Sequence, residues 1–332
     1  MDVYLDRANL FSFVNSKEDY RFDDCCRLLK NQCDIKFCFS KMDLLSSVAE
    51  TDEEKCNIEQ VHHWIKRMTS GISGSVKYDV CIDRPLKSNI YKSFSEKQLS
   101  SVFLLHDDKI AFLKDRGVMH FSDVGEELDT LSCLYFDDYQ FNKLVDVQKL
   151  KSWSDLNDKI SPATDIIIND RYIFSSEELI EGNCCALLEV LCHFASNVKI
   201  NIVIFTLSVQ DKFGQEPNWE NIRNRIKKVI FNKVGEKPNV TIIKSRKNDH
   251  DRIIFTNYNY IVSGDSFNYF DCKGNLITKG SDLTISSLCY TENYDKAINF
   301  IYTKQEQINE LLRLQNPSNI IGDKKSNFLK FE

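Results

Sequence analysis

The C-terminal half of the chain alternates continuous apolar runs with amphipathic segments, and this alternation restricts the fold more than any other feature. The runs DIIIND (165–170), KINIVIFTLS (199–208) and NVTIIKS (239–245) are apolar almost throughout. Strands buried on both faces of a parallel sheet have this composition. Residues 181–196 and 218–234, which lie between the runs, have the spacing of helices with one apolar face. The order strand, helix, strand, helix, strand predicts an α/β domain.

The segments that follow extend the predicted sheet. Residues 252–265 read as two more strands, the next stretch contains a Lys-Gly-Asn turn typical of a hairpin, and 294–315 reads as a long helix. We therefore predict a mixed sheet flanked by helices, with polar last residues that fray. A polar stretch at 154–165 predicts a linker, which gives two domains at 1–155 and 156–332.

The N-terminal domain is harder to predict because its apolar runs are short. Its pattern is consistent with an α/β or an α+β domain. A helix is predicted at 58–68, where Ile58, Val61, Ile65 and Met68 share one face. Strands are predicted at 1–6, 34–40, 76–82, 100–106, 109–114 and 131–136.

Composition excludes several classes of protein. The 332 residues include only 11 glycines and 5 prolines, which rules out collagen-like and linker-like chains. The 12 cysteines form no CxxC pair, so we predict reduced core residues in a cytoplasmic protein rather than a zinc centre. No signal peptide is visible, and no apolar run approaches the roughly 20 residues of a membrane helix. Neither a membrane nor a cofactor is expected as a partner.

The net charge of −6 hides an uneven distribution. Residues 223–252 contain ten basic and three acidic residues, a balance of +7, so the rest of the chain carries −13. A basic segment of this kind suits the phosphate backbone of a nucleic acid, although a solvated helix face with lysine stems over apolar surface has the same composition. The candidate nucleic-acid-binding residues are Arg223, Arg225, Lys227, Lys228, Lys244, Arg246 and Lys247.

A set of potentially reactive side chains begins at His250. Arg252 follows at i+2, so the imidazole and the guanidinium would project from the same face of a strand. Asn257 and Gly264 come next, and Ser266 and Asn268 lie in the turn after the second strand. The pattern places a possible nucleophile, a phosphate-binding cation and small polar groups at one edge of a sheet.

This segment resembles the phospholipase D superfamily motif H-x-K-x4-D-x6-G-S-x-N, because it reads His250-x-Arg252-x4-Asn257-x6-Gly264. The resemblance covers about residues 160–310. It implies a catalytic set of His250, Arg252, Asn257, Ser266 and Asn268 and metal-independent cleavage of a phosphodiester through a phosphohistidine. The sequence departs from the family where Arg252 replaces lysine, Asn257 replaces aspartate and Asp265 occupies the serine position.

The family needs two histidine motifs in an active site, and this chain carries one. The resemblance therefore implies a homodimer that pairs two copies of His250 across a two-fold axis. It implies a phosphodiesterase, in particular a nuclease, in bacterial defence or a mobile element. The alternative is an inactive, phospholipase D-like nucleic-acid-binding or scaffold subunit of a larger complex. The departures at 257 and 265 favour this alternative, because they change residues that catalysis in the family needs.

A third hypothesis places the chemistry in the N-terminal domain. Asp2 and Asp6 lie at the ends of the strand predicted at 1–6, and acids at strand ends can hold Mg²⁺ for nuclease chemistry. The acidic segment 121–140 could add ligands from Glu126, Glu127 and Asp129, although a solvated loop accounts for the same residues.

Overall fold

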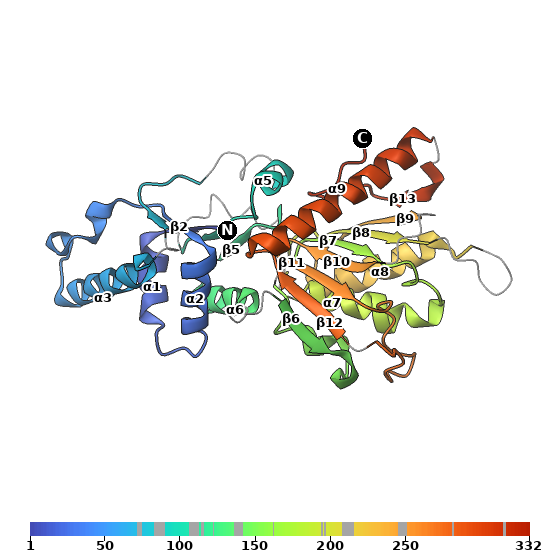
Figure 1. Ribbon diagram of the computed structural model, residues 1–332, viewed down its shortest axis with the longest axis horizontal. Coiled ribbons are helices and arrows are strands. Elements are labelled where there is room, and N and C mark those ends of the chain that lie inside the picture. Colours follow the sequence, from blue (N-terminus) through green and yellow to red (C-terminus); the bar gives the residue numbers. More distant parts are fainter. Residues whose placement is uncertain are drawn as a thin grey trace. The chain divides into compact units, whose positions relative to one another are not determined.

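The chain forms two compact units, which are described separately. The computed structural model describes residues 1–71, 75–82, 90–105, 113, 116–121, 123–135, 142–161, 163–193, 195, 197–207, 216–244, 251–280, 282–314 and 317–332. The N-terminal unit comprises Met1–Tyr135 with Cys289–Thr291, and the C-terminal unit comprises Phe136–Leu288 with Glu292–Glu332. Figure 1 labels their helices and strands.

The N-terminal unit is built on a parallel sheet of order β3-β2-β1-β4-β5, so it is an α/β unit. The chain runs outward from β1 to β3 and then returns to the other side of β1 to add β4 and β5. The strands are β1 Asp2–Leu5, β2 Asp34–Phe37, β3 Ser75–Lys77, β4 Ser101–Phe103 and β5 Met119–Phe121. The described helices are α1 Arg7–Asn15, α2 Phe22–Gln32, α3 Asp52–Thr69, α5 Ile90–Glu96 and α6 Val124–Leu134.

One predicted strand of this unit is wrong. Residues 131–134 of the segment 131–136 belong to helix α6. Asp123 caps this helix, and Leu128, Leu131 and Leu134 are buried at helical spacing. A short apolar run does not distinguish a strand from a buried helix end. The predicted strand at 109–114 falls outside the described residues apart from Leu113.

The C-terminal unit contains a mixed sheet of order β13-β9-β8-β7-β10-β11-β12-β6, as the alternation of apolar runs predicts. Strands β7, β8 and β9 are parallel, and each of the other neighbouring pairs is antiparallel. The strands are β6 Asn142–Asp146, β7 Asp165–Asn169, β8 Asn201–Thr206, β9 Asn239–Lys244, β10 Arg252–Thr256, β11 Asn259–Ser263, β12 Asp282–Ser287 and β13 Ile320–Gly322. Its helices are α7 Ala186–Leu191, which follows a π-helical turn at Glu181–Cys185, α8 Trp219–Val234 and α9 Thr291–Arg313.

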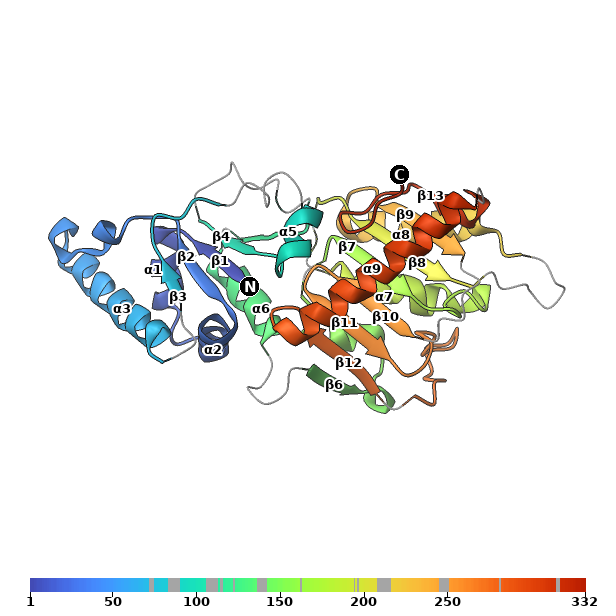
Figure 2. The ribbon, with the colours of Figure 1, turned by 45° about the horizontal axis from the view of Figure 1, so that its top comes forward.

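Helices cover this sheet on both faces. Right-handed crossovers place α7 and α8 on one face, since the chain moves from β7 to β8 to β9 in one direction. Helix α9 crosses the strands in front of them in Figure 2, with α7 and α8 behind. All residues of β7 and β8 are buried, which explains why the interiors of these strands, 166–168 and 202–205, are apolar on both faces.

The predicted linker at 154–165 belongs instead to the C-terminal unit. Trp153, Leu156 and Ile160 are buried, and the preceding strand β6 pairs with β12. The division between the units therefore falls after residue 135, twenty residues before the predicted boundary at 155. The segment looks polar because a 3₁₀ turn at Trp153–Leu156 points its polar side chains outward.

The last residues do not fray as predicted. Their backbone and side chains bind the start of β7: Asp165 accepts hydrogen bonds from Asn327 N at 2.8 Å and from Asn327 Nδ2 at 2.6 Å. Phe328 is fully buried and packs edge-on against Phe255 at 5.1 Å between ring centroids. No helix among the described residues is long and apolar enough to cross a membrane.

We expect Phe328→Ala to lower the free energy of unfolding by about 3–5 kcal/mol, because the substitution leaves a cavity beside Phe255. Denaturant titration followed by circular dichroism measures the change. Phe231→Ala is the matched control, because Phe231 lies on α8 with 43% of its surface exposed and should change stability by less than about 0.5 kcal/mol. Equal effects of the two substitutions would contradict the packing of the C-terminal segment.

Candidate functional site

The carboxyl end of β7 is the topological switch point of the C-terminal sheet. The chain adds β8 on one side of β7 and β10 on the other. In open α/β sheets, ligands bind outside the carboxyl ends of strands at such a point. Because β10 runs antiparallel to β7, with Ile253 opposite Asn169, Arg252 starts its strand at this end.

Asp170 is a buried acceptor at this end of β7. Its carboxylate accepts hydrogen bonds from Tyr172 N at 2.9 Å, Ser266 Oγ at 2.8 Å and Phe267 N at 2.8 Å. Burial raises the pKa of Asp170 above its ordinary value, although these hydrogen bonds and the charge of Arg252 act in the opposite direction. The carboxylate thereby holds the turn after β11 against the end of β7.

Asn169 holds the other part of the predicted motif. Its Nδ2 donates to the carbonyl oxygen of Asp251 at 2.5 Å, immediately before β10. Its Oδ1 accepts from Nζ of Lys304 on α9 at 2.7 Å. The last residue of β7 and the residue after it thus anchor residue 251 and residues 266–267, which are separated by the whole β10–β11 hairpin.

Asn257, one of the predicted catalytic residues, has a structural role. His250 lies outside the described residues. Asn257 is buried after β10, where its Oδ1 accepts from Thr164 N at 2.8 Å and Asp165 N at 3.1 Å. Its Nδ2 has no hydrogen-bond partner among the described residues. Asn257 therefore organises the backbone at the start of β7, away from the carboxyl end.

Ser266 and Asn268 lie near the carboxyl end of β7 with their donors in use. Ser266 Oγ donates to Asp170, as described above. Asn268 Nδ2 donates to Tyr172 O at 2.6 Å and to Ser175 Oγ at 3.3 Å. Both amide hydrogens of Asn268 are therefore occupied in this state.

Most of the candidate basic residues are paired with acids from distant parts of the chain. Arg223 lies 2.8 Å from Asp323, Lys227 lies 2.6 Å from the same carboxylate, and Lys244 lies 3.1 Å from Glu216. Arg225 forms a hydrogen-bonded ion pair with Glu181. The acids come from outside residues 223–252, so a count within that segment overestimates the exposed positive charge.

Lys228 differs from its neighbours on α8. It is exposed and has no ion pair within the described part of the chain. Arg246 and Lys247 lie outside the described residues.

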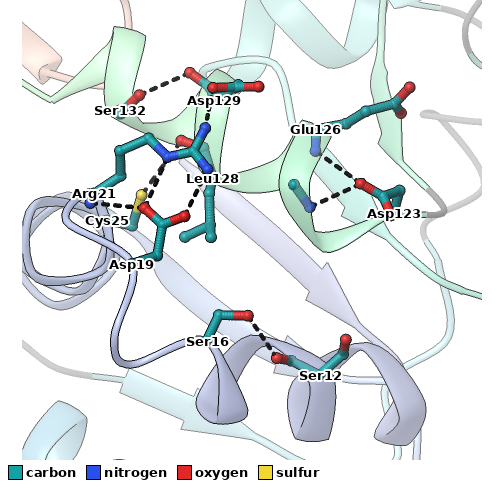
Figure 3. Close-up of polar contacts among 11 residues, drawn as sticks. Ser12, Ser16, Asp19, Arg21, Cys25, Asp123, Glu126, Leu128, Asp129 and Ser132 are labelled. Atoms are coloured by element: carbon teal, nitrogen blue, oxygen red, sulfur yellow. Dashed lines mark hydrogen bonds and ion pairs between the residues drawn. The ribbon is translucent and has the colours of Figure 1, made fainter.

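Among the described residues, the acids proposed as metal ligands do not all gather into one site. Asp129 pairs with Arg21, and Asp123 caps α6 by accepting from Gly125 N at 2.8 Å and Glu126 N at 3.2 Å (Figure 3). The side chain of Glu126 is exposed. Asp2 is bound by Lys36 at 2.6 Å and Lys97 at 2.5 Å. These acids are held by separate partners.

Asp6 and Glu127 do come together, through Asn9, at the carboxyl end of β1. Asp6 accepts from Asn9 N at 2.6 Å, and Asn9 Nδ2 donates to Glu127 Oε2 at 2.8 Å. Glu127 is fully buried, and its Oε1 has no hydrogen-bond partner among the described residues. Burial and, to a lesser extent, the charge of Asp6 raise the pKa of Glu127 to about 8, against the hydrogen bond from Asn9. No group of three His, Cys, Asp or Glu within the described residues could hold a metal ion.

Comparisons with known proteins leave the family open. No family model and no curated protein matches the chain. A solved structure of TrmBL2, described as an archaeal chromatin protein with a novel mode of DNA binding, matches with a TM-score of 0.25 and 10% identity. The match covers 54% of this chain and 59% of that one. A likeness this low carries no argument about fold or function.

Sequence reasoning missed the residues that organise the carboxyl end of β7. Asn169 and Asp170 close the apolar run at 165–170, and polar residues that end a buried strand are a recognisable signal at a switch point. Lys304 had no such signal, because it is one of two lysines on a long amphipathic helix.

We expect Asn257→Ala to lower the free energy of unfolding by roughly 2–4 kcal/mol, since it leaves the buried N–H groups of Thr164 and Asp165 without an acceptor. Asn257→Asp keeps an acceptor oxygen and should cost less. Chemical denaturation of both variants measures the difference. An alanine variant as stable as the wild type would contradict this role for Asn257.

Glu127 should make folding dependent on pH. The carboxyl keeps its proton up to about pH 8 in the folded chain, whereas its ordinary pKa is 4.5. The folded state therefore binds more protons between these values, and stability falls as pH rises through this interval. We expect Glu127→Gln to flatten this dependence and to raise the thermal midpoint at pH 8–9 relative to the wild type. The exposed neighbour control, Glu126→Gln, should leave the slope unchanged.

Proposed function

We propose that the C-terminal unit is a phosphodiesterase of the phospholipase D type, in particular a nuclease, acting at the carboxyl end of β7. The observation that carries the proposal is the convergence of two parts of the motif on consecutive residues. Asn169 holds the backbone at 251 and Asp170 holds Ser266 and Phe267. A phospholipase D-like arrangement needs this convergence, because its histidine and its small polar residues act on one phosphate.

The roles follow from chemistry and from the resemblance. His250 of one chain attacks phosphorus, and His250 of a second chain protonates the leaving oxygen and then activates water. Arg252 binds the phosphate with its planar guanidinium. Asn268 must release Tyr172 O before its amide can stabilise the charge of the phosphorane. The mechanism needs no metal and no cofactor, and it makes the active form a homodimer.

The substrate class proposed is nucleic acid. Lys228 is exposed and has no ion pair within the described residues, which supports it as a phosphate contact. Arg246 and Lys247 remain candidates from the sequence alone. The cellular setting proposed is the bacterial cytoplasm, in a defence system or a mobile element.

The second candidate function is binding without cleavage, as a nucleic-acid-binding or scaffold subunit of a larger complex. A specific observation favours it: both donors of Asn268 are engaged within the protein. A site in this state can hold a phosphate through Arg252, but the amide of Asn268 offers the phosphate no hydrogen bond.

Cleavage of fluorescent single-stranded and double-stranded DNA and RNA, with EDTA or with Mg²⁺, separates these functions. We expect cleavage in EDTA that His250→Ala abolishes and His63→Ala leaves intact, because His63 is an exposed residue of α3. Binding without cleavage in the wild type would support the second candidate. Cleavage that requires Mg²⁺ and disappears in Asp6→Asn would instead place the chemistry in the N-terminal unit and sink the proposal.

A further inference from the structure

The C-terminal segment brings a second set of cations to helix α8. Strand β13 pairs with β9 and ends the strand order of the sheet (Figure 1), and the chain then turns at residues 323–325, the C-terminal turn. Lys324 and Lys325 of this turn are exposed, and neither forms an ion pair within the described part of the chain. A charge count over residues 223–252 does not include them.

Two hydrogen bonds to β9 fix the backbone of the C-terminal turn. Asp323 Oδ2 accepts from Val240 N at 2.8 Å, and Lys324 N donates to Thr241 Oγ1 at 2.9 Å. Lys324 has a left-handed backbone with a φ of 53°, a conformation that glycine adopts more readily. The exposed lysine side chains therefore leave a backbone that the sheet already holds.

Asp323 joins the C-terminal turn to α8. Its carboxylate lies 2.8 Å from Arg223 and 2.6 Å from Lys227, which are one helical turn apart. Arg223 also pairs with Glu220 at 2.7 Å. Because one carboxylate binds both α8 cations, they lie beside the two lysines of the turn. Four cations and two acids thus meet here, a balance of +2.

An exposed aromatic ring continues the cationic stripe of α8. Phe231 has 43% of its surface exposed and follows Lys227 at i+4 and Lys228 at i+3, so the three side chains share one side of the helix. A single exposed apolar residue has no meaning by itself. Its place among cations does, because proteins bind single-stranded nucleic acid by combining a basic surface with aromatic rings on which bases stack.

We propose that α8 and the C-terminal turn form a surface for single-stranded nucleic acid, in which the cations contact phosphates and Phe231 stacks on a base. The inference rests on the nucleic-acid partner of the proposed function, but it requires no cleavage. A duplex is the poorer partner, because its bases already stack on one another and leave no free face for the ring. The surface consists of Arg223, Lys227, Lys228, Phe231, Lys324 and Lys325.

Lys324→Gly combined with Lys325→Gln tests the phosphate contacts. Glycine suits the left-handed backbone at 324, so the fold should be retained. The probe is a fluorescent oligothymidine of about 20 nucleotides, longer than common single-strand sites. Its phosphorothioate backbone keeps the charge and resists hydrolysis, and fluorescence anisotropy gives Kd.

We expect the double variant to raise Kd roughly 25-fold at about 0.1 M salt and to reduce the slope of log affinity against log salt by about 1.4, since two phosphate contacts are lost. The matched control is Lys273→Gln with Lys279→Gln, which changes the net charge equally at exposed positions between β11 and β12. The control should leave Kd within about twofold of the wild type.

Phe231→Ala tests the stacking contact. We expect Kd to rise about tenfold, as the loss of one stacked base produces. The salt slope should stay the same, because no charge is removed. Tyr302→Ala is the control, since Tyr302 is an exposed aromatic residue on α9 with 45% of its surface exposed.

Asp323→Asn should change affinity in the opposite direction. The amide oxygen can still accept from Val240 N, but the negative charge between the cations is gone. We expect Kd to fall about fivefold, as one more available cation produces. Thermal unfolding followed by circular dichroism shows that the variant is folded. Ion pairs that serve only stability would give a lower thermal midpoint and no gain in affinity, which would contradict the proposed surface.

Several results would overturn the inference while leaving the phosphodiesterase to its own test. A wild type that does not bind the oligonucleotide would do so, as would a duplex bound as tightly as the single strand together with an unchanged Kd in Phe231→Ala. An equal loss in the control with Lys273 and Lys279 replaced would show general electrostatic attraction instead. Cleavage is measured separately with phosphodiester oligonucleotides in EDTA, so binding without cleavage keeps this surface and overturns only the enzyme.

Discussion

The hydrogen bonds accepted by Asp170 at the buried end of β7 are the constraint on which the candidate site depends. Beyond this residue no ladder joins β7 to the turn after β11, so a side chain must supply the acceptor that the backbone cannot. Asp170 binds one hydroxyl and two backbone N–H groups, and this offsets the cost of burying it. Without this carboxylate, Ser266 Oγ and Phe267 N would lose the acceptor that joins them to the end of β7.

Contacts between distant parts of the chain also explain why counting charges within one segment does not give the exposed charge of that segment. An ion pair joins residues that are close in space, and the partners of the α8 cations lie up to 100 residues away in sequence, as Arg223 and Asp323 do. Of the ten cations in residues 223–252, Arg223, Arg225, Lys227 and Lys244 are paired with acids from outside the segment, so the fold reduces its positive balance. What remains for a polyanion is a smaller set of cations, and Lys228 is the described example among the residues predicted to bind nucleic acid.

The parts of the fold that sequence reasoning predicted correctly are those in which one physical requirement dominates. Runs of β-branched residues such as 166–168 are typical of a strand buried on both faces, and the structure has such a strand there. The strand predicted at 131–136 is wrong because a short apolar run is consistent with the repeat of a strand and with that of a helix. The predicted linker at 154–165 is wrong because Ser154 and Asp155 make the sequence polar, while Trp153 and Leu156 of the same turn are buried. The positions of Asn169, Asp170 and Lys304 in the site depend on tertiary contacts, which no local pattern contains.

The departures from the phospholipase D pattern differ in what they imply once their contacts are known. Asn257 accepts two backbone hydrogen bonds with its oxygen, a role that an amide fills as well as a carboxylate, so the change at 257 says little about catalysis. Asp265 is held by its own turn, where its carboxylate accepts from Ser266 N at 2.9 Å and Thr278 Oγ1 at 2.7 Å. Asn268 is different, because its donors face Tyr172 and Ser175 rather than a substrate. For the two functions proposed above, the decisive point is whether a bound phosphate competes successfully with Tyr172 and Ser175 for the amide of Asn268.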